Sequence, residues 1–162
     1  MRRVFITGAF GFIGWRLLNA IDSPIRILSR IERSNYDTVV CDFKEEDIPK
    51  SALKSIDTVF HLAGFSHDLR NARKISDLYY KVNVSATIQL ANLAANSGVK
   101  KFVFVSSVKA GGSPHHGTCA NEIDQKNTED VYGKTKREAE LKLLEIGQVS
   151  GMHVSIIRPS LV

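Results

Sequence analysis

The stretch Thr7-Gly8-Ala9-Phe10-Gly11-Phe12-Ile13-Gly14 decides the fold of this chain. It follows an apolar run, Val4-Phe5-Ile6, and leads into an amphipathic segment, so the order is a strand, a glycine turn and a helix. The first N–H groups of a helix have no backbone partners and carry the positive end of the helix dipole. Glycines here let an anionic pyrophosphate approach the bare backbone, with Gly8 in the tight turn, Gly11 beside the phosphate and Gly14 packed on the strand. The stretch predicts a dinucleotide-binding turn, although glycine triplets also occur in ordinary loops.

The bulk composition predicts one soluble globular domain. The chain has 162 residues, of which 43% are hydrophobic and 24% are charged, proportions typical of a chain with a real core. No apolar run approaches the roughly 20 residues that a membrane-spanning helix needs, and the N-terminus lacks a signal-peptide pattern, so we expect a cytoplasmic protein. Cys41 and Cys119 have no CxxC or Cys/His spacing, so neither a disulfide framework nor a metal site is expected.

The net charge of +5 does not by itself indicate a nucleic-acid-binding protein. The basic residues are scattered, as in Lys100-Lys101 and Lys136-Arg137, and no basic stripe carries interleaved aromatic residues. A modest excess of lysine and arginine is typical of a solvated surface. We therefore expect neither nucleic acid nor a membrane among the partners.

Apolar runs and helical periodicities alternate along the rest of the chain. We expect further strands over residues 25–28, 38–41, 57–62, 101–106 and 153–158, and helices over 45–53, 76–97 and 129–147. Such alternation predicts a Rossmann-type α/β fold, a doubly wound parallel sheet of about six strands with helices on both faces. Residues 109–128 form the longest loop, and long loops in compact domains are often functional.

The end of the second strand, Ser29-Arg30, bears on the choice of cofactor. In a dinucleotide-binding fold this end faces the adenosine ribose, where an acidic residue binds the 2′-hydroxyl of NAD and an arginine accommodates the 2′-phosphate of NADP. Ser29 occupies the place of the acid, Arg30 follows it, and Arg33 is nearby. The pattern favours NADP, with NAD as the alternative; an Arg30 that points into solvent or stacks on the adenine is the simpler interpretation.

Two further strand ends are expected to border the cofactor. Asp42-Phe43 follows the third strand and is placed beside the adenine. Ala63-Gly64 follows the fourth strand, where small side chains leave room for a cofactor. His61 is interpreted as an ordinary strand residue, because no second ligand stands at metal spacing.

Tyr132 and Lys136 are four residues apart on an expected helix, so they share one face and can reach the same ligand. Free tyrosine titrates at about 10, and a cationic neighbour lowers the pKa of a phenol toward the range where it serves as an acid or base. Ser106-Ser107 ends the fifth strand across the crevice, where a serine hydroxyl could bind the substrate oxygen whose proton Tyr132 takes. Such pairs are common on helices, so the pattern gains weight only beside the glycine turn and the serine-ended strand.

Together these pieces resemble the short-chain dehydrogenase/reductase superfamily, in its extended branch of nucleotide-sugar epimerases, dehydratases and reductases. The motifs that carry the resemblance span almost the whole chain: Thr7–Gly14, His61–Gly64, Asn83–Thr87, Phe102–Ser107, Tyr132 with Lys136, and Arg158–Val162. The resemblance implies Tyr132 as the acid/base, Lys136 as its pKa partner and ribose ligand, and Ser107 rather than Ser106 as the hydroxyl that orients the substrate. The cofactor-binding residues that we expect are Gly8, Phe10, Gly11, Phe12, Ile13, Gly14, Arg30, Asp42, Phe43, Leu62, Ala63, Gly64, Asn83, Val105, Tyr132 and Lys136.

A departure within the branch narrows the subclass. The dehydratases of this branch carry an Asp-Glu pair just after the serine or threonine, and here the pair is replaced by Val108-Lys109. The run Ser106–Ala110 instead resembles a subgroup of UDP-glucose 4-epimerase-like proteins, which implies transient oxidation at sugar C4 and return of hydride to the other face. An NADPH-dependent carbonyl or keto-sugar reductase, toward which Arg30 tilts the balance, and a non-catalytic dinucleotide-binding module are the alternatives.

The resemblance also sets expectations for the domain and its partners. Extended members continue past the Arg-Pro motif into a substrate domain, so residues 1–162 correspond to the NAD(P)-binding domain alone. We expect this chain to bind NAD(P) and to turn over a nucleotide sugar, or another small carbonyl or hydroxyl compound, poorly or not at all. Related enzymes dimerise through the two helices that here hold Asn83 and Tyr132, which implies a homodimer.

Overall fold

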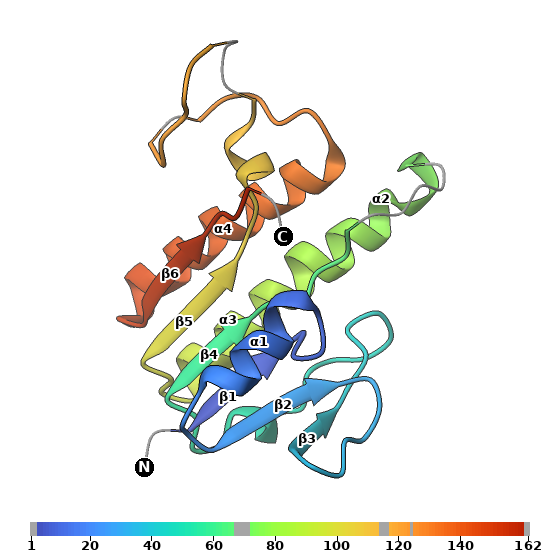
Figure 1. Ribbon diagram of the computed structural model, residues 1–162, viewed down its shortest axis with the longest axis vertical. Helices are drawn as coiled ribbons and strands as arrows, with labels where there is room; N and C mark the ends of the chain where they lie inside the picture. Colours follow the sequence, from blue (N-terminus) through green and yellow to red (C-terminus); the bar gives the residue numbers. More distant parts are fainter. Residues whose placement is uncertain (1–2, 67–71, 114–116, 124, 161–162) are drawn as a thin grey trace.

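The computed structural model describes residues 3–66, 72–113, 117–123 and 125–160. Its strands form one sheet in the order β3-β2-β1-β4-β5-β6, and every neighbouring pair is parallel (Figure 1). The strands are β1 (Val4–Thr7), β2 (Ile25–Ser29), β3 (Asp37–Val40), β4 (Thr58–His61), β5 (Lys101–Val105) and β6 (His153–Ile157). The predicted Rossmann-type fold is confirmed. Leu161 and Val162, part of the last predicted motif, lie outside the described residues.

Helices lie on both faces of this sheet (Figure 1). The α-helices are α1 (Phe12–Ala20), α2 (Ala72–Tyr80), α3 (Ala86–Asn96) and α4 (Val131–Ser150), and the shorter helical segments are η1 (Lys50–Leu53), η2 (Lys81–Ser85) and η3 (Val108–Gly111). None of the helices within the described ranges is long and apolar enough to span a membrane.

Alternation along β1 divides the core between the two faces. Val4 and Ile6 point toward α1, where they pack with Leu18 and with Ile27 of β2. Phe5 points to the opposite face, where the buried residues of α3 and α4 complete the larger cluster. Burial of such apolar side chains stabilises the fold by roughly 1.5–3 kcal/mol for each large one.

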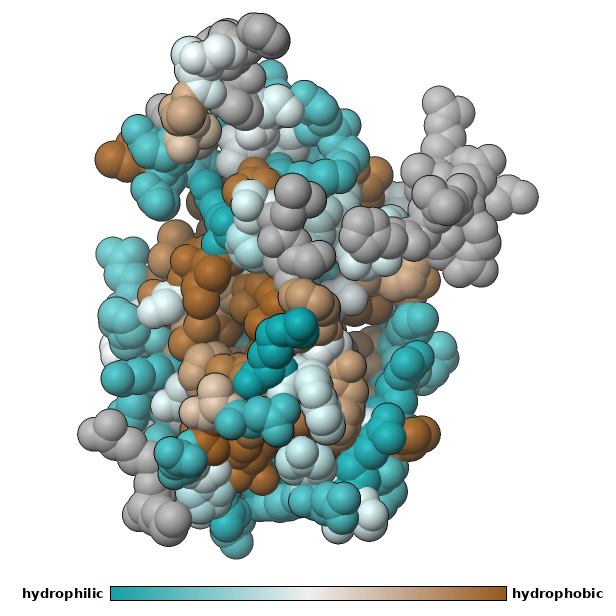
Figure 2. Space-filling view, in the orientation of Figure 1, coloured by the Kyte–Doolittle hydropathy of each residue, from teal (hydrophilic) through white to brown (hydrophobic). Residues whose placement is uncertain are grey.

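The face that carries α1 is only partly covered. The cluster under α1 includes residues of β1, β2 and β4, whereas no helix of the described ranges covers β5 and β6 on this side. Hydrophobic side chains gather on this face between α1 and β6 (Figure 2). The exposed large apolar residues of these two elements are Phe12, Trp15 and Ile157.

Two predicted helices differ from the observed ones. The helix expected over 45–53 is wrong, because only the 3-10 turn η1 forms there. The side chain of Asp42 accepts the N–H of Lys44, and Pro49 would interrupt any longer helix. The helix expected over 76–97 begins earlier, at Ala72, and runs as α2, the π-turn η2 and α3.

The π-turn places Asn83 inside the protein. Its side chain accepts the N–H of Phe65 at 2.7 Å and donates to the carbonyl of Phe65 at 3.0 Å. The same amide donates to the hydroxyl of Thr135 on α4 at 3.2 Å. The widened turn therefore ties the segment after β4 to α4, a use of the kind seen where π-turns interrupt α-helices.

His61 is a buried strand residue, as predicted. Its ring nitrogens lie 2.6 Å from the hydroxyl of Thr7 and 2.8 Å from that of Thr87, and its ring stacks on Phe104 at 5.6 Å between centroids. One neutral tautomer satisfies both contacts. Burial, with a smaller contribution from the Lys136 charge, lowers the pKa of His61 to about 3. The ring is therefore neutral across the physiological range.

We expect His61 to make the fold sensitive to mild acid. Below pH 6.5, roughly the ordinary pKa of histidine, the unfolded chain binds a proton that the folded chain refuses, so stability falls as the pH drops toward 3. The free energy of unfolding should decrease by about 2 kcal/mol between pH 7 and pH 5. Urea denaturation at both pH values measures this change.

The matched controls are His61→Gln and His153→Gln, the latter at an exposed position. The first variant should lose most of the pH dependence, and the second should keep it. An equal dependence in the wild type and in His61→Gln would contradict this account.

Candidate functional site

A crevice crosses the carboxyl ends of the strands, around β1, where the strand order reverses. It consists of two adjoining cavities of about 680 and 670 Å³. Gly8, Gly11 and Gly64 line both of them. In open parallel sheets, this is the position where ligands bind.

The glycine turn brings the start of α1 against the end of β1. Gly8 has a φ of +69°, which side-chain-bearing residues rarely adopt, and a Cβ on Gly14 would lie 2.2 Å from the carbonyl oxygen of Gly8. At Gly11 the nearest atom to a Cβ would be that same oxygen, at 3.3 Å, a tight contact that a small shift relieves, and Gly11 lines the cavity.

The first turn of α1 fits an anion. Gly11 is its N-cap, no side chain among the described residues caps the turn, and no acidic residue lies in it. The N–H groups of this turn therefore keep their capacity to donate, and the helix dipole favours a negative charge. These residues fit the pyrophosphate of a dinucleotide.

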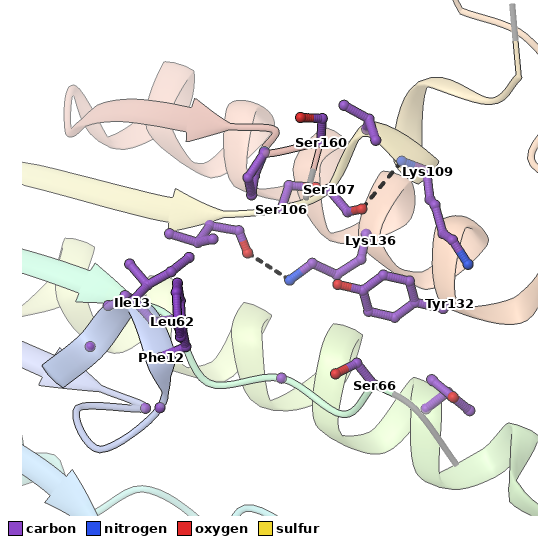
Figure 3. Close-up of a pocket in the computed structure, with 18 of the residues that line it drawn as sticks. Phe12, Ile13, Leu62, Ser66, Ser106, Ser107, Lys109, Tyr132, Lys136 and Ser160 are labelled. Carbon is purple, nitrogen blue, oxygen red and sulfur yellow. Dashed lines mark hydrogen bonds between the residues drawn. The ribbon is translucent and has the colours of Figure 1, made fainter. Parts of the chain in front are cut away.

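The first cavity brings together the predicted catalytic residues (Figure 3). Ser107 follows β5, whereas Tyr132 and Lys136 point into the cavity from α4. The Nζ of Lys136 donates to the carbonyl oxygen of Val105 at 2.8 Å and lies 4.1 Å from the ring centroid of Phe104. The spacing of Tyr132 and Lys136 thus produces the shared face that the sequence predicted.

Burial controls the charge of Lys136. It lowers the pKa of Lys136 to about 8, although the carboxylate of Glu140 acts in the opposite direction. Glu140 is itself buried and accepts two hydrogen bonds from Arg158, at 2.9 and 2.5 Å. This ion pair joins the end of β6 to α4.

The pKa of Tyr132 is raised, in contrast to the lowering that we expected from Lys136. Burial is the main cause, and the groups that oppose it are Ser107 and Lys109. The ammonium of Lys136 is directed to the carbonyl of Val105 and to the ring of Phe104. The sequence could not predict that Lys109 is a cation that lowers the pKa of Tyr132.

The two serines after β5 have different surroundings. The hydroxyl of Ser107 accepts the N–H of Lys109 at 3.3 Å. The hydroxyl of Ser106 is buried in the cavity wall and has no hydrogen-bond partner among the described residues. A buried hydroxyl without a partner costs stability, so the Ser106 hydroxyl fits a site that a polar ligand completes.

The second cavity gathers cations near the end of β2. Arg30 and Arg33 line it together with Asp42, Phe43 and Lys44. The guanidinium of Arg33 lies 4.4 Å from the ring centroid of Phe10, and its buried Nε has no hydrogen-bond partner among the described residues. This end of the crevice suits a ligand that is both planar and anionic.

The structure brings all but one of the predicted site residues to the crevice. The first cavity is lined by Gly8, Gly11, Phe12, Ile13, Gly14, Leu62, Gly64, Val105, Ser107, Tyr132 and Lys136. The second is lined by Gly8, Phe10, Gly11, Arg30, Asp42, Phe43, Ala63 and Gly64. Asn83 lines neither cavity, because its side chain is occupied by Phe65 and Thr135 behind the wall.

Sequence reasoning missed several residues that line the crevice. Lys109 and Asp130 lie in the first cavity, and Lys44 lies in the second. Asp130 carries a local signal that could have found it, since it precedes the first turn of the Tyr132 helix and accepts the N–H of Gly133 as an N-cap. Lys109 carries no such signal.

The sequence matches a known protein family and is similar to several of its relatives. Residues 4–162 match the model of the NAD dependent epimerase/dehydratase family. A UDP-glucose 4-epimerase from Vibrio cholerae is 34% identical over 99% of this chain and 52% of its own length. A 3 beta-hydroxysteroid dehydrogenase/Delta 5-->4-isomerase from Mycobacterium tuberculosis is 29% identical over 98% of this chain and 46% of its own length.

A solved structure of MoeE5 in complex with UDP-glucose and NAD has a similar fold. It superposes with a TM-score of 0.80 at 27% identity and covers 95% of this chain, which in turn covers 52% of that protein. The chain therefore spans about half the length of the relatives that it matches.

Proposed function

Because the chain belongs to the NAD dependent epimerase/dehydratase family, we propose that it is the NAD(P)-binding domain of a nucleotide-sugar epimerase. The observation that carries this proposal is the crevice itself, in which the uncapped start of α1 and the group Ser107, Tyr132 and Lys136 line one cavity. A dinucleotide that lies with its pyrophosphate on α1 reaches both cavities. The exposed apolar face between α1 and β6 supports a second domain, because another surface normally covers such a face.

Three residues of the first cavity, Tyr132, Ser107 and Lys136, would each have a separate role in the reaction. A bound nicotinamide cofactor would supply reversible hydride transfer at the substrate carbon. Tyr132 would remove the hydroxyl proton of that carbon and later give it back, while Ser107 orients the same oxygen. Lys136 would hold the ribose hydroxyls. Its position beside the carbonyl of Val105 fits that role, since both lie on the cavity wall.

A nucleotide sugar is the substrate class that we propose. The V. cholerae relative is a UDP-glucose 4-epimerase, and MoeE5 was solved with UDP-glucose. The absence of an acidic pair at Val108-Lys109 argues against sugar dehydration. Because the chain spans only half of these relatives, we expect most of the sugar pocket to be supplied from outside these residues.

A keto-reductase that uses NADPH is the second candidate. The observation that favours it is the group of cations in the second cavity, Arg30, Arg33 and Lys44, which suits a 2′-phosphate. Ser107, Tyr132 and Lys136 of the first cavity would then act in the direction of reduction only, with Tyr132 as the proton donor to a carbonyl oxygen.

We also propose a homodimer through the two helical stretches that hold Asn83 and Tyr132, which are the run α2–η2–α3 and the helix α4. Leu141 and Leu144 are exposed on α4, and Tyr80 is exposed at the end of α2. Apolar residues that recur on one helix face are typical of a helix–helix interface.

The cofactor assignment predicts that NADPH binds more tightly than NADH, by about tenfold for one well-placed arginine–phosphate contact. Fluorescence titration of the chain with each nucleotide measures the ratio. Arg30→Ala and Arg33→Ala should each reduce the preference, because each removes a cation from the second cavity. Tighter binding of NADH would contradict the NADP assignment.

A variant at Gly11 tests the proposed pyrophosphate position independently of the 2′-phosphate. Gly11→Ala should abolish the binding of both nucleotides, because its methyl group would enter the space over the first turn of α1. Its melting temperature should stay close to the wild-type value, since Gly11 has an ordinary φ of −76°. Unchanged nucleotide binding would exclude the proposed pyrophosphate position.

The role of Tyr132 predicts that Tyr132→Phe lowers turnover of UDP-glucose by a factor of about 10²–10⁴ and leaves the nucleotide Kd unchanged. Because slow turnover is expected of this chain, the rate is best measured with the chain in excess over the substrate. Measurable turnover of UDP-glucose that is equal in the two proteins would exclude Tyr132 as the acid/base.

The proposed dimer predicts a mass twice the monomer value of 18.0 kDa by light scattering. Leu141→Glu combined with Leu144→Glu should give a monomer, because it places like charges opposite one another across the interface. Ile157→Glu, at an exposed position in β6, is the control that stays dimeric. A monomeric wild type would refute the dimer.

A further inference from the structure

Lys109 contacts both of the residues that we propose to act on the substrate oxygen. Its backbone N–H donates to the hydroxyl of Ser107 at 3.3 Å. Its Nζ lies 6.0 Å from the ring centroid of Tyr132, within reach of a cation–π interaction. Figure 3 shows Lys109 and Tyr132 on the same side of the cavity. Lys109 therefore links the turn after β5 to the first turn of α4.

Asp130 fixes this link from the side of α4. One carboxylate oxygen accepts the N–H of Gly133 at 2.7 Å and caps the helix, and the other accepts a hydrogen bond from Nζ of Lys109 at 2.7 Å. Packing adds a second constraint, because a Cβ on Gly133 would lie 2.6 Å from the carbonyl oxygen of Lys109. The helix turn that carries Tyr132 is thus held against Lys109 by its cap, by an ion pair and by close backbone contact.

Within the described ranges, the charged and titratable groups that face Tyr132, together with the Ser107 hydroxyl, come from four segments. Lys109 lies on η3, Asp130 and Lys136 belong to α4 and its cap, Ser107 follows β5, and Tyr79 lies on α2. Ser107 and Lys109 lower the pKa of Tyr132, whereas Asp130 and Tyr79 raise it. The ammonium of Lys136 is occupied by the carbonyl of Val105.

We propose that Lys109 is a positioning residue for Tyr132: held by Asp130, its ammonium stabilises the phenolate of Tyr132 while its backbone fixes the adjacent Ser107 hydroxyl. The proposal rests on the proposed role of Tyr132 and adds a second cation to the site, opposite Lys136. Lys109 stands where the dehydratases of this branch carry an acidic residue. Unlike a carboxylate, its ammonium stabilises the ionised form of Tyr132.

The exposure of the Lys109–Asp130 pair distinguishes this role from a structural one. The two side chains are 58% and 45% exposed, and solvent screening leaves exposed ion pairs with little effect on the stability of a fold. The pair is therefore a weak contributor to folding. Its measurable effect should fall on the ionisation of Tyr132 rather than on the melting temperature.

The test measures that ionisation directly, without requiring turnover. The four tyrosines are replaced by 3,5-difluorotyrosine, which brings phenol ionisation into the neutral range, and each is titrated by ¹⁹F NMR. The Tyr132→Phe variant identifies the signal of residue 132. Titrations are then compared for the wild type, Lys109→Met, Lys109→Arg and Asp130→Asn, with Lys134→Met as the matched change at an exposed position of α4.

The proposal predicts that the midpoint of residue 132 depends on the charge of Lys109. Lys109→Met should raise this midpoint by about 0.5–1 pH unit, the size expected for one partly screened charge at this distance. Asp130→Asn keeps the helix cap, removes a negative charge and also releases the Lys109 ammonium, so these two effects oppose one another and its shift should be smaller. Lys109→Arg and Lys134→Met should leave the midpoint unchanged.

A purely structural role predicts a different pattern. If the pair only held the helix in place, both variants would expose the phenol and lower its midpoint. A midpoint that falls or does not move in Lys109→Met would therefore overturn the proposal. Loss of nucleotide binding or turnover would bear on the proposed function instead, and this titration would still report on Lys109.

Discussion

The approach of Gly14 to Gly8 is the contact on which the rest of the site depends. No side chain fits between them, since a Cβ on Gly14 would lie 2.2 Å from the carbonyl oxygen of Gly8. The contact sets the first turn of α1 at the carboxyl end of β1, where it joins two cavities into one crevice. Every other part of the site is arranged along that crevice, with Arg30 and Arg33 at one end and Tyr132 at the other.

Much of the fold could be predicted because each strand carries its own apolar pattern. Val4 and Ile6 face α1 while Phe5 faces the other layer, a division that alternation alone indicates. The predicted secondary structure was wrong where a local side-chain hydrogen bond competes with helix formation. Asp42 captures a nearby N–H and Pro49 interrupts the segment, so the helix expected over 45–53 is reduced to one short turn.

The site could be predicted where chemistry follows helical spacing or a strand end, as for Lys136 and Ser107. It could not be predicted where the partners come from distant segments. The ammonium of Lys136 turns to the carbonyl of Val105, 31 positions away, and that of Lys109 turns to Asp130, 21 positions away. The hydrogen-bond partners of Asn83 could not be predicted for the same reason, because its side-chain amide bonds with Phe65 and Thr135, which are distant in sequence.

The most direct test of the central claim is an amide NMR titration of the ¹⁵N-labelled chain with NADPH. The account predicts that the N–H signals of Gly11, Phe12 and Ile13 shift most strongly, because the pyrophosphate lies on the first turn of α1. Saturable binding that leaves these three signals unmoved would contradict it.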